Sequence, residues 1–520
     1  MRMDKKKEVN IQNIQGSIWP RLPKYYETFL FFKIKDEDTF KTHLRSFADK
    51  VTTGAQCKAY FVETDDLPQA TPGKPRKDTP PEQRKPFEAV NISFSYKGIE
   101  KLVMQRRDDK LIDELHMRGM YKDRTGEGPD ISELLAPEYK PPEGHRDDND
   151  DWRVDGLLIV TAQTKDKLEE KIKEVETAFN VDTASASVGI AFRKEGNLRN
   201  ADGKAEKAQG GTVSLHGKEH FGFEDEISQP QIRGLDPTPK KGEQRIIPPG
   251  WIFTGLDGDH AKQPRWATEG SFLAFREIEE KVPEFHKFVR ESSQKIPSFD
   301  DGTGEKLAAY LMGRWKNGSP IELDPDGTKP EYVFANNFDY KKGHTLWKNT
   351  KCPFAAHIRK MRPRSDLYVG NKNTDDADPA EVAVNHAETN SNVILRRSIT
   401  FGPEVDEVEE AQETKKKRGI YFLCYQSNFR NGFNQLVTRW ASNKTFAPNT
   451  GIKGGPGIDP IISDRNRPDR SEGYFSIYQK PDDPDPYKLQ FQFASWTDQR
   501  GGEYFFTPSI EALKTKLSEE

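Results

Sequence analysis

Apolar residues in this chain gather in short runs, and four of these runs precede a segment in which apolar side chains recur at steps of three and four. The runs occupy residues 27–34, 156–162, 270–278 and 418–426. Short runs rich in aromatic and β-branched residues are typical of buried strands, whereas steps of three and four align side chains on one face of a helix. The pattern therefore predicts four strand–helix units. The helical faces carry Phe40, Leu44, Phe47 and Val51; Leu168, Ile172, Val175 and Phe179; Val282, Phe285 and Val289; and Phe429, Phe433, Leu436 and Trp440.

Two units fall in each half of the chain, which predicts two related α+β domains, each a sheet with helices on one face. We expect the second unit of each half to place its strand beside the first. Residues 87–102 add a strand followed by a turn, and prolines and glycines at 236–250 interrupt any regular pattern. We therefore predict an N-terminal domain over residues 1–240 and a C-terminal domain over residues 241–520. Three long stretches are predicted as loops: 66–86, 136–151 and 367–391.

The composition excludes several classes of protein. The chain has 520 residues, too many for one ordinary core, and 32% of them are charged. Its 80 basic and 84 acidic residues give a net charge of -4, which argues against nucleic acid as a partner because such binders carry a clear basic excess. No apolar run is long enough to span a bilayer, so we expect no membrane partner. The oligomeric state stays open at this point.

The N-terminus and the cysteines bear on the cellular compartment. The first ten residues, MRMDKKKEVN, are basic, but no apolar core follows them, so we expect no signal peptide. This leaves an intracellular protein, or a secreted one whose signal has been removed. Cys57, Cys352 and Cys424 are odd in number and lack metal-type spacing, which argues against a disulfide framework.

One cluster of polar residues is a candidate metal site. His216 and His220 stand four apart, and Glu224 and Asp225 follow closely. These residue types are common ligands of transition metals. Gly217 lies within the segment and disfavours the regular helix that would place both histidines on one face. We keep this site as a minor alternative.

The stretch CPFAAHIRKMRPR, residues 352–364, surrounds one histidine with small and basic neighbours. Ala355 and Ala356 precede His357 and leave room for a flat, apolar group. The lysine and arginines that follow suit a ligand with anionic substituents. A lone histidine is more often a satisfied core residue, so the assignment depends on what accompanies it elsewhere in the chain.

Three further stretches differ from both core and solvated surface. HFGFEDEISQP predicts a tight segment that presents Asp225, NVILRRSITFGPEV places Arg396 after a strand-like run, and GIDPIIS sets Asp459 among apolar residues. Together with GSFLAFRE, LMGRWKNGSPI and RGIYFLCYQ, these segments resemble the dye-decolorizing peroxidases, most closely the fungal members, and follow the same order. The resemblance extends from NIQNIQGSIWPRLPK near the N-terminus to GIDPII.

The resemblance implies two ferredoxin-like α+β domains of the dimeric α+β barrel superfamily, with antiparallel sheets and helices packed on them. It also implies a peroxidase whose cofactor is haem b. Such an enzyme reduces hydrogen peroxide and oxidises small aromatic donors by one-electron steps. Phenols and dyes, anthraquinone dyes included, are the implied donors.

Three residues match positions that hold the haem in this family. His357 matches the axial ligand of the haem iron. Asp459 matches the carboxylate that accepts the other ring N–H of this histidine, a contact that makes the imidazole more basic. Arg364 matches a residue that pairs with a haem propionate, where a guanidinium meets a carboxylate through two hydrogen bonds.

Four residues match the side of the haem on which peroxide binds. Asp225 matches the aspartate that moves a proton from one peroxide oxygen to the other. Arg396 matches the arginine whose charge keeps that aspartate ionised and stabilises the charge that develops as the O–O bond breaks. We assign this role to Arg396 and not to its neighbour Arg397. Ile420 and Phe422 match apolar residues that cover the pocket.

Two further positions make the function of this chain less simple. The family motif carries a glycine after the aspartate, and this chain has Glu226 there. If the position requires a positive φ, a glutamate is strained, and its carboxylate would make Asp225 harder to ionise. An alternative is therefore a non-catalytic haem carrier or sensor. Trp440 matches a tryptophan that passes electrons from the surface in relatives, although its place on an apolar helix face is typical of a core residue.

Overall fold

The computed structural model describes residues 8–65, 79–103, 107–125, 135–143, 151–181, 183–202, 215–237, 246–338, 340, 351–367, 391–448, 452–463, 473–477, 487–491 and 496–519. Much of the three predicted loops, namely residues 66–78, 144–150 and 368–390, lies outside these ranges.

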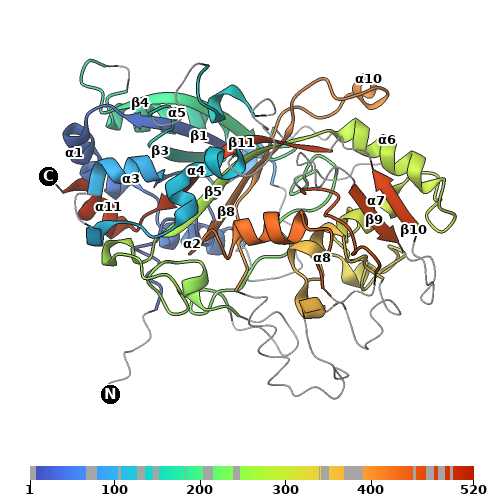
Figure 1. The fold of residues 1–520 in the computed structure, drawn as a ribbon. Coiled ribbons are helices and arrows are strands. Elements are labelled where there is room, and N and C mark those ends of the chain that lie inside the picture. The colour runs from blue at the N-terminus through green and yellow to red at the C-terminus, as the bar shows by residue number, and fades with distance from the viewer. Residues whose placement is uncertain are drawn as a thin grey trace, which may run out of the picture.

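The strands and helices follow one another along the chain as Figure 1 shows. The strands are β1 (Tyr26–Ile34), β2 (Glu88–Phe94), β3 (Gly156–Ala162), β4 (Val188–Asn197), β5 (Ser271–Glu280), β6 (Leu395–Arg396), β7 (Ile399–Phe401), β8 (Gly419–Gln426), β9 (Gly473–Ile477), β10 (Tyr487–Phe491) and β11 (Thr497–Thr507). The α-helices are α1 (Glu37–Phe47), α2 (Gly54–Glu63), α3 (Tyr96–Val103), α4 (Glu114–Thr125), α5 (Lys165–Ala178), α6 (Val282–Ser293), α7 (Glu305–Met312), α8 (His357–Met361), α10 (Glu407–Glu410) and α11 (Ile510–Lys514). A π-helix spans Gln435–Ala441.

Within the described residues, nine strands form one antiparallel sheet in the order β4-β1-β3-β2-β11-β5-β8-β6, and β7 also pairs with β8. The predicted strand pairs are present: Phe29 of β1 lies opposite Ile159 of β3, and Ala274 of β5 lies opposite Cys424 of β8. The antiparallel α+β architecture is thus confirmed. The C-terminal strand β11, which the pattern did not predict, pairs with β2 and β5 and joins the strands of both halves. The division of the chain at residue 240 stays a prediction.

The sheet curls until its two ends meet. The hydroxyl of Thr400, on β7, donates a hydrogen bond of 2.6 Å to the carbonyl of Asn197, on β4. Strands β1 and β5 are not neighbours in the sheet, yet the ring centroids of Phe29 and Phe275 lie 5.0 Å apart across its interior. A twisted antiparallel sheet that closes in this way becomes barrel-like and fills its interior with side chains.

Helices cover the outer face of the sheet. Phe40, Leu44 and Phe47 of α1 pack in the same core as Leu30 and Phe32 of β1. Helix α1 begins after its N-cap residue, Asp36, whose carboxylate accepts a hydrogen bond of 2.8 Å from the amide of Thr39. A helix and a strand that each expose an apolar face gain most of their stability by burying those faces together. Figure 1 shows α1, α3 and α11 gathered on this side of the molecule.

Two local predictions are corrected. The segment after β2 is the helix α3 and not a turn, because Ile99, Leu102 and Val103 are buried on one of its faces. The predicted stripe after β8 is not one helical face. Phe433 packs in the core that also contains the apolar residues of α1, whereas Leu436 and Trp440 pack with Phe446 in a separate cluster. The π-helix explains the difference, because its wider turn rotates successive side chains away from the α-helical register.

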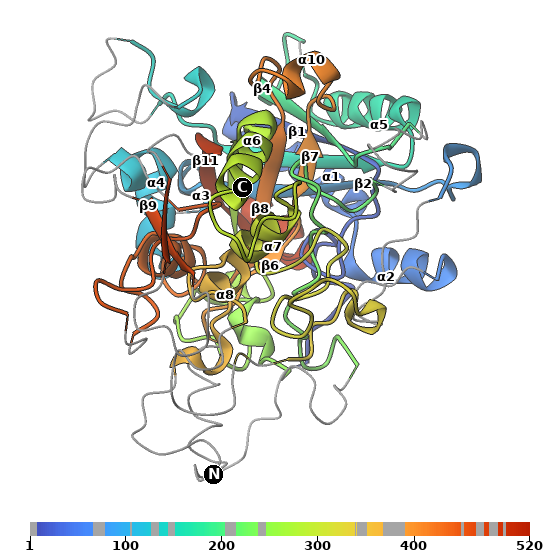
Figure 2. The same cartoon turned by 90° about the vertical axis from the view of Figure 1, so that its right-hand side faces the viewer.

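The other end of the molecule has its own apolar core. Residues of α6, α7 and the segment before α8 form it, Phe285, Leu307 and Ala355 among them. Figures 1 and 2 place α6, α7, α8 and the two-stranded sheet of β9 and β10 together at this end, beyond the ends of β5 and β8. Described residues at this end of the molecule, Met312, Arg314 and Tyr340 among them, line the cavity described below.

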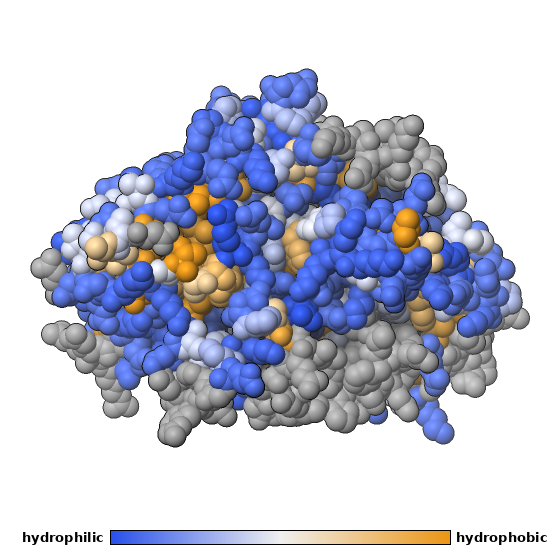
Figure 3. Space-filling view, turned by 90° about the horizontal axis from the view of Figure 1, so that it is seen from above, coloured by the Kyte–Doolittle hydropathy of each residue, from blue (hydrophilic) through white to orange (hydrophobic). Residues whose placement is uncertain are grey.

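The surface seen from above is mostly hydrophilic, and hydrophobic residues gather mainly in one area left of centre (Figure 3). Among the described residues, no helix is both long and apolar enough to cross a membrane. All three cysteines are free and buried.

Candidate active site

One cavity brings together most of the residues that the sequence singled out. It is lined by the loop after β4, by β5, by α8 and the turn that follows it, and by β6, β8 and the π-helix. Its empty volume, with the open mouth included, is about 1710 Å³. Six of the predicted site residues line it: Asp225, His357, Arg364, Arg396, Ile420 and Phe422. These residues come from segments far apart in the sequence, so only the fold places them around one space.

His357 is held by a buried carboxylate. It is the first residue of α8, and its Nδ1 lies 2.8 Å from Oδ2 of Asp459. The other oxygen of Asp459 accepts hydrogen bonds of 2.8 and 3.1 Å from the amides of Ile461 and Ile462. Burial opposes ionisation of Asp459, but His357 and these two amides outweigh it and lower the pKa of the carboxyl. Because Nδ1 is engaged, Nε2 is the ring nitrogen that remains for a ligand in the cavity.

The two alanines before His357 do not border the cavity. Ala355 and Ala356 are buried in the apolar core of this end of the molecule, and neither is among the lining residues. The expectation that they leave room for a ligand is therefore wrong. Ile358 and Met361, which follow the histidine, line the cavity instead.

Arginines gather along another part of the lining. Arg364 donates hydrogen bonds of 2.6 Å to the carbonyl of Phe338 and 3.1 Å to Oδ1 of Asn336. Arg314 donates to the carbonyls of Gly318 and Ala335, both at 2.7 Å. Burial, together with the charge of Arg364, lowers the pKa of Arg314 to about 9. Both arginines thus donate these hydrogen bonds to neutral oxygens.

This arrangement fits a ligand with acidic substituents. The guanidinium of Arg314 is buried and that of Arg364 is partly buried. With neutral partners, they leave positive charge at the edge of the cavity, and such charge is stabilised by a carboxylate. Nε of Arg364 is buried and makes no hydrogen bond within the described residues. An apolar cavity with one free imidazole nitrogen and a cationic edge suits haem, whose ring is flat and whose propionates are anionic.

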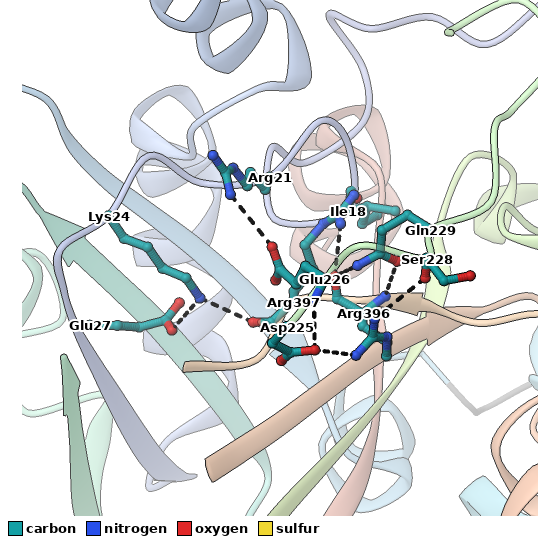
Figure 4. A network of polar contacts seen from close by, with 10 residues as sticks. All are labelled: Ile18, Arg21, Lys24, Glu27, Asp225, Glu226, Ser228, Gln229, Arg396 and Arg397. Atoms are coloured by element: carbon teal, nitrogen blue, oxygen red, sulfur yellow. Dashed lines mark hydrogen bonds and ion pairs between the residues drawn. The ribbon is translucent and has the colours of Figure 1, made fainter. Parts of the chain in front are cut away.

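Asp225 and Arg396 form an ion pair at the cavity wall (Figure 4). Nη1 of Arg396 contacts Oδ1 of Asp225, and the same oxygen accepts a hydrogen bond of 2.6 Å from the amide of Glu226. Gln229 fixes the backbone of Arg396 from both sides: its amide nitrogen donates to the carbonyl and its amide oxygen accepts from the N–H, each at 3.1 Å. The ion pair and the two hydrogen bonds of Gln229 therefore join the loop of residues 220–230 to strand β6.

The two neighbouring arginines have different surroundings. Arg397 is buried, does not line the cavity, and donates hydrogen bonds of 3.1 and 2.9 Å to the carbonyl of Ile18. Arg396 faces the cavity. The choice of Arg396 over Arg397 as the candidate site residue agrees with this placement.

Glu226 has the backbone conformation that its position was expected to need. Its φ is 60°, in the left-handed region that glycine adopts most easily. Its side chain does not extend toward Arg396 but reaches Arg21, with 3.5 Å between Oε2 and Nη1 (Figure 4).

Apolar residues form another wall of the cavity. Ile420 and Phe422 alternate along β8 and so point to the same face of the strand. Phe433, Leu436 and Val437 extend this wall from the segment before and within the π-helix. Trp440 lies on the same π-helix but not in the lining; its side chain is only 3% exposed and stacks on Phe446 with centroids 5.1 Å apart. A role for Trp440 in electron transfer stays a prediction.

Sequence analysis missed several lining residues. Arg314 lies in LMGRWKNGSPI and Gln229 in HFGFEDEISQP, two segments that had been noted without a role for these residues. Glu219 and Glu280 are buried in the lining, and burial raises the pKa of both, most of all that of Glu280. Glutamates are usually exposed, and the residues next to Glu219 and Glu280 give no local sign of burial.

The alternative metal site does not form. His216 packs against the ring of Tyr25, and Nε2 of His220 lies 2.9 Å from the carbonyl of Phe401. Over the described ranges, no group of three or more His, Cys, Asp or Glu side chains is arranged to hold a metal ion.

Comparison with known proteins supports one family throughout. Residues 13–200 match the model of the DyP dimeric alpha+beta barrel domain, and residues 239–447 match that of the Dyp-type peroxidase C-terminal domain. The dye-decolorizing peroxidase AauDyP1 of Auricularia auricula-judae is 31% identical over 519 residues, which cover 98% of this chain and 87% of that protein. An ancestral D-type dye-decolorizing peroxidase superposes with a TM-score of 0.78 at 32% identity, covering 99% of this chain and 100% of the other. A dye-decolorizing peroxidase in complex with 2,6-dimethoxyphenol superposes with a TM-score of 0.72 at 31% identity, covering 98% and 99%.

Proposed function

The chain belongs to the dye-decolorizing peroxidases, and from that membership we propose which of its residues bind the cofactor and which act on peroxide. It is a haem-dependent peroxidase that reduces hydrogen peroxide and oxidises phenolic and dye donors. The observation that carries the assignment of roles is the convergence of His357, backed by Asp459, and the Asp225–Arg396 pair on one cavity.

His357 binds the haem iron through Nε2 in this proposal. The carboxylate of Asp459 fixes the orientation and tautomer of the ring and makes the imidazole a stronger donor. Arg364, with Arg314 beside it in the lining, would hold the propionates at the cationic edge of the cavity. The apolar wall around Phe422 would pack against the ring and limit access of water.

Haem b is the form of the cofactor that these residues favour. Covalent attachment of c-type haem requires cysteines, usually in a C-x-x-C-H motif. Cys57, Cys352 and Cys424 are all buried, and none of them lines the cavity. The haem is therefore held by coordination, ion pairs and packing alone.

Haem, when bound, supplies the iron at which peroxide is cleaved, and the oxidised cofactor then accepts electrons from the donors. With haem bound, Asp225 would take a proton from hydrogen peroxide and return it to the departing oxygen, which would leave as water. Arg396 keeps Asp225 ionised and places positive charge beside the separating oxygens. Gln229 holds Arg396 in place through its backbone.

The rival proposal of a non-catalytic haem carrier rested on Glu226. It is less favoured, because the Asp225–Arg396 pair is intact and the carboxylate of Glu226 has its own cation in Arg21.

Rapid mixing of haem-loaded protein with one equivalent of hydrogen peroxide tests the proposal. We expect a Soret band before mixing, its replacement within milliseconds, and its return on addition of a phenol. His357→Ala should lose the wild-type Soret band and regain it with exogenous imidazole, whereas His286→Ala, on the half-exposed pair with Glu410, should behave as wild type. A Soret band unmoved by peroxide at acid and at neutral pH would leave only the carrier.

A further inference from the structure

Glu226 carries a charged side chain at a position where only the backbone N–H contacts Asp225. A non-glycine residue in the left-handed region carries backbone strain and persists there only when its surroundings hold it. The backbone serves the site, since the amide of Glu226 binds Oδ1 of Asp225. A glycine would supply the same N–H without the strain. The side chain therefore needs its own explanation.

That side chain turns away from the ion pair of Asp225. Oε2 of Glu226 lies 3.5 Å from Nη1 of Arg21, and the two side chains are 11% and 10% exposed. Arg21 precedes β1, and its guanidinium lies over the ring of Phe61, 5.0 Å from the centroid. Glu226 borders both the main cavity and a second, small cavity that Arg21 and Arg397 also line. Figure 4 shows the two carboxylates aimed in different directions, each at its own arginine.

Several charged and titratable groups surround the carboxylates of Asp225 and Glu226. Arg396 pairs with Asp225, Lys218 pairs with Glu224 at 3.1 Å, and Lys24 pairs with Glu27 at 2.6 Å. The buried acids Glu219 and Glu280 interact electrostatically with Asp225 from the same cavity. Within the described residues, the charged and titratable groups around the two carboxylates include Arg21, Lys24, Glu27, Lys218, Glu219, Glu224, Asp236, Glu280, Arg314, Arg396 and Arg397, and the cavity lining adds Arg276, His357, Arg362 and Arg364.

We propose that Arg21 and Glu226 are a charge-compensating pair through which the N-terminal segment positions the loop of Asp225 and keeps that carboxylate ionised. Arg21 neutralises the extra carboxylate, so Glu226 neither repels the charge of Asp225 nor competes for Arg396. Both are positioning residues. With them, Asp225 keeps its role as the base although Glu226 stands where the family motif carries a glycine. This inference rests on the proposed function of Asp225.

A double-mutant cycle tests the pair: Arg21→Gln, Glu226→Gln and the double variant, with Arg193→Gln as a control. Arg193, on strand β4, forms exposed ion pairs with Glu169 of helix α5 and with Glu195 of β4. Two quantities are measured across the acid and neutral range. One is the rate constant for reaction with hydrogen peroxide; the other is the dissociation constant of cyanide, read from the Soret shift, which involves no turnover.

In Arg21→Gln, Glu226 has lost the charge of Arg21. We expect the acidic midpoint of both pH profiles, the pH at which the value is halfway to its neutral plateau, to rise by about one pH unit. In Glu226→Gln, the unbalanced Arg21 should move it downward, and the double variant should return it to the wild-type position. Arg21→Lys keeps the charge and should behave as wild type. The Soret intensity after haem loading should stay the same in all of them.

An acidic midpoint in Arg21→Gln that coincides with that of Arg193→Gln would overturn the pair, as would a double variant that keeps the shift. If Arg21→Gln does not fold, an unmoved midpoint in Glu226→Gln has the same consequence. A wild-type protein that does not react with peroxide overturns the function proposed for Asp225, and the cyanide profiles still decide the pair.

Discussion

The imidazole Nδ1 of His357 lies 2.8 Å from Oδ2 of Asp459, a carboxylate that has no exposed surface and comes 102 residues later in the chain. A buried carboxylate is stable only with compensating hydrogen bonds, and Asp459 has three of them, from the ring and from two backbone amides. The pair therefore links His357, the proposed ligand of the haem iron, to the apolar core that contains Ile458 and Ile461.

Asp459→Asn should keep haem bound but weaken the donor strength of His357. Loss of such an outer partner costs about 10- to 100-fold in metal affinity or activity. We expect a higher reduction potential of the iron and a slower reaction with peroxide, measured by spectroelectrochemistry and stopped flow. Asp324→Asn, at another buried aspartate that accepts backbone amides, should lower stability and leave the potential unchanged. Equal potentials in both variants would contradict the role of Asp459.

Asp225→Asn should slow the reaction with peroxide by about 10²- to 10⁴-fold, because the amide cannot accept the proton. The Soret spectrum of the resting protein should be retained, since Asp225 does not hold the haem in the proposal. Stopped-flow absorbance gives the rate constant. Asp257→Asn, on the half-exposed pair with Arg233, serves as the control. A rate within twofold of wild type would assign the proton transfer to another group.

Arg364→Gln should weaken haem binding by about 10- to 100-fold, the worth of a hydrogen bond to a charged group. The rate of haem transfer to an excess of an acceptor protein measures the change. Arg233→Gln removes a guanidinium that is not in the cavity lining and should leave the transfer rate unaltered. Transfer rates that do not differ between the two variants would exclude a propionate at Arg364.

Glu280 should make stability fall as pH rises. Burial, followed by the charge of Glu219, raises its pKa well above the ordinary 4.5, so the folded protein keeps a proton that the unfolded chain releases. The stabilising effect of this proton is complete below about pH 4.5 and declines by up to about 1.4 kcal/mol per pH unit until the folded-state pKa is passed. Glu280→Gln keeps an acceptor for the amide of His220 and should flatten this dependence in denaturant titrations at several pH values. Parallel curves for both proteins would show that Glu280 titrates normally.

Trp440→Phe should slow the oxidation of bulky dyes about tenfold or more while small phenols react at the wild-type rate, if electrons pass through the indole. The ratio of the two rates is the measurement. Trp496→Phe changes another buried indole, 4% exposed, that packs with Phe285 and outside the cavity lining. A fall in both rates, or the same change in both variants, would give Trp440 a packing role only.

The sequence determined the elements and most candidate residues. Buried strands such as Tyr26–Ile34 and Gly156–Ala162 are nearly continuous apolar runs because both of their faces are covered, and the helices after them show their apolar stripes at steps of three and four. These are local signals, which depend on residues a few positions apart. The stretches around His357, Asp225, Arg396 and Asp459 were recognisable for the same reason.

The tertiary structure decided what those residues do together. In it, the C-terminal strand β11 lies between β2 and β5. Phe433 and Trp440 pack in different cores, and Ala355 is buried outside the cavity lining. The tertiary structure also paired Arg21 with Glu226 across 205 positions and buried Glu280 beside Glu219. Such contacts join segments that are distant in the chain. They depend on closure of the whole sheet and on the burial of charge that follows from it, and no local pattern of residues encodes either.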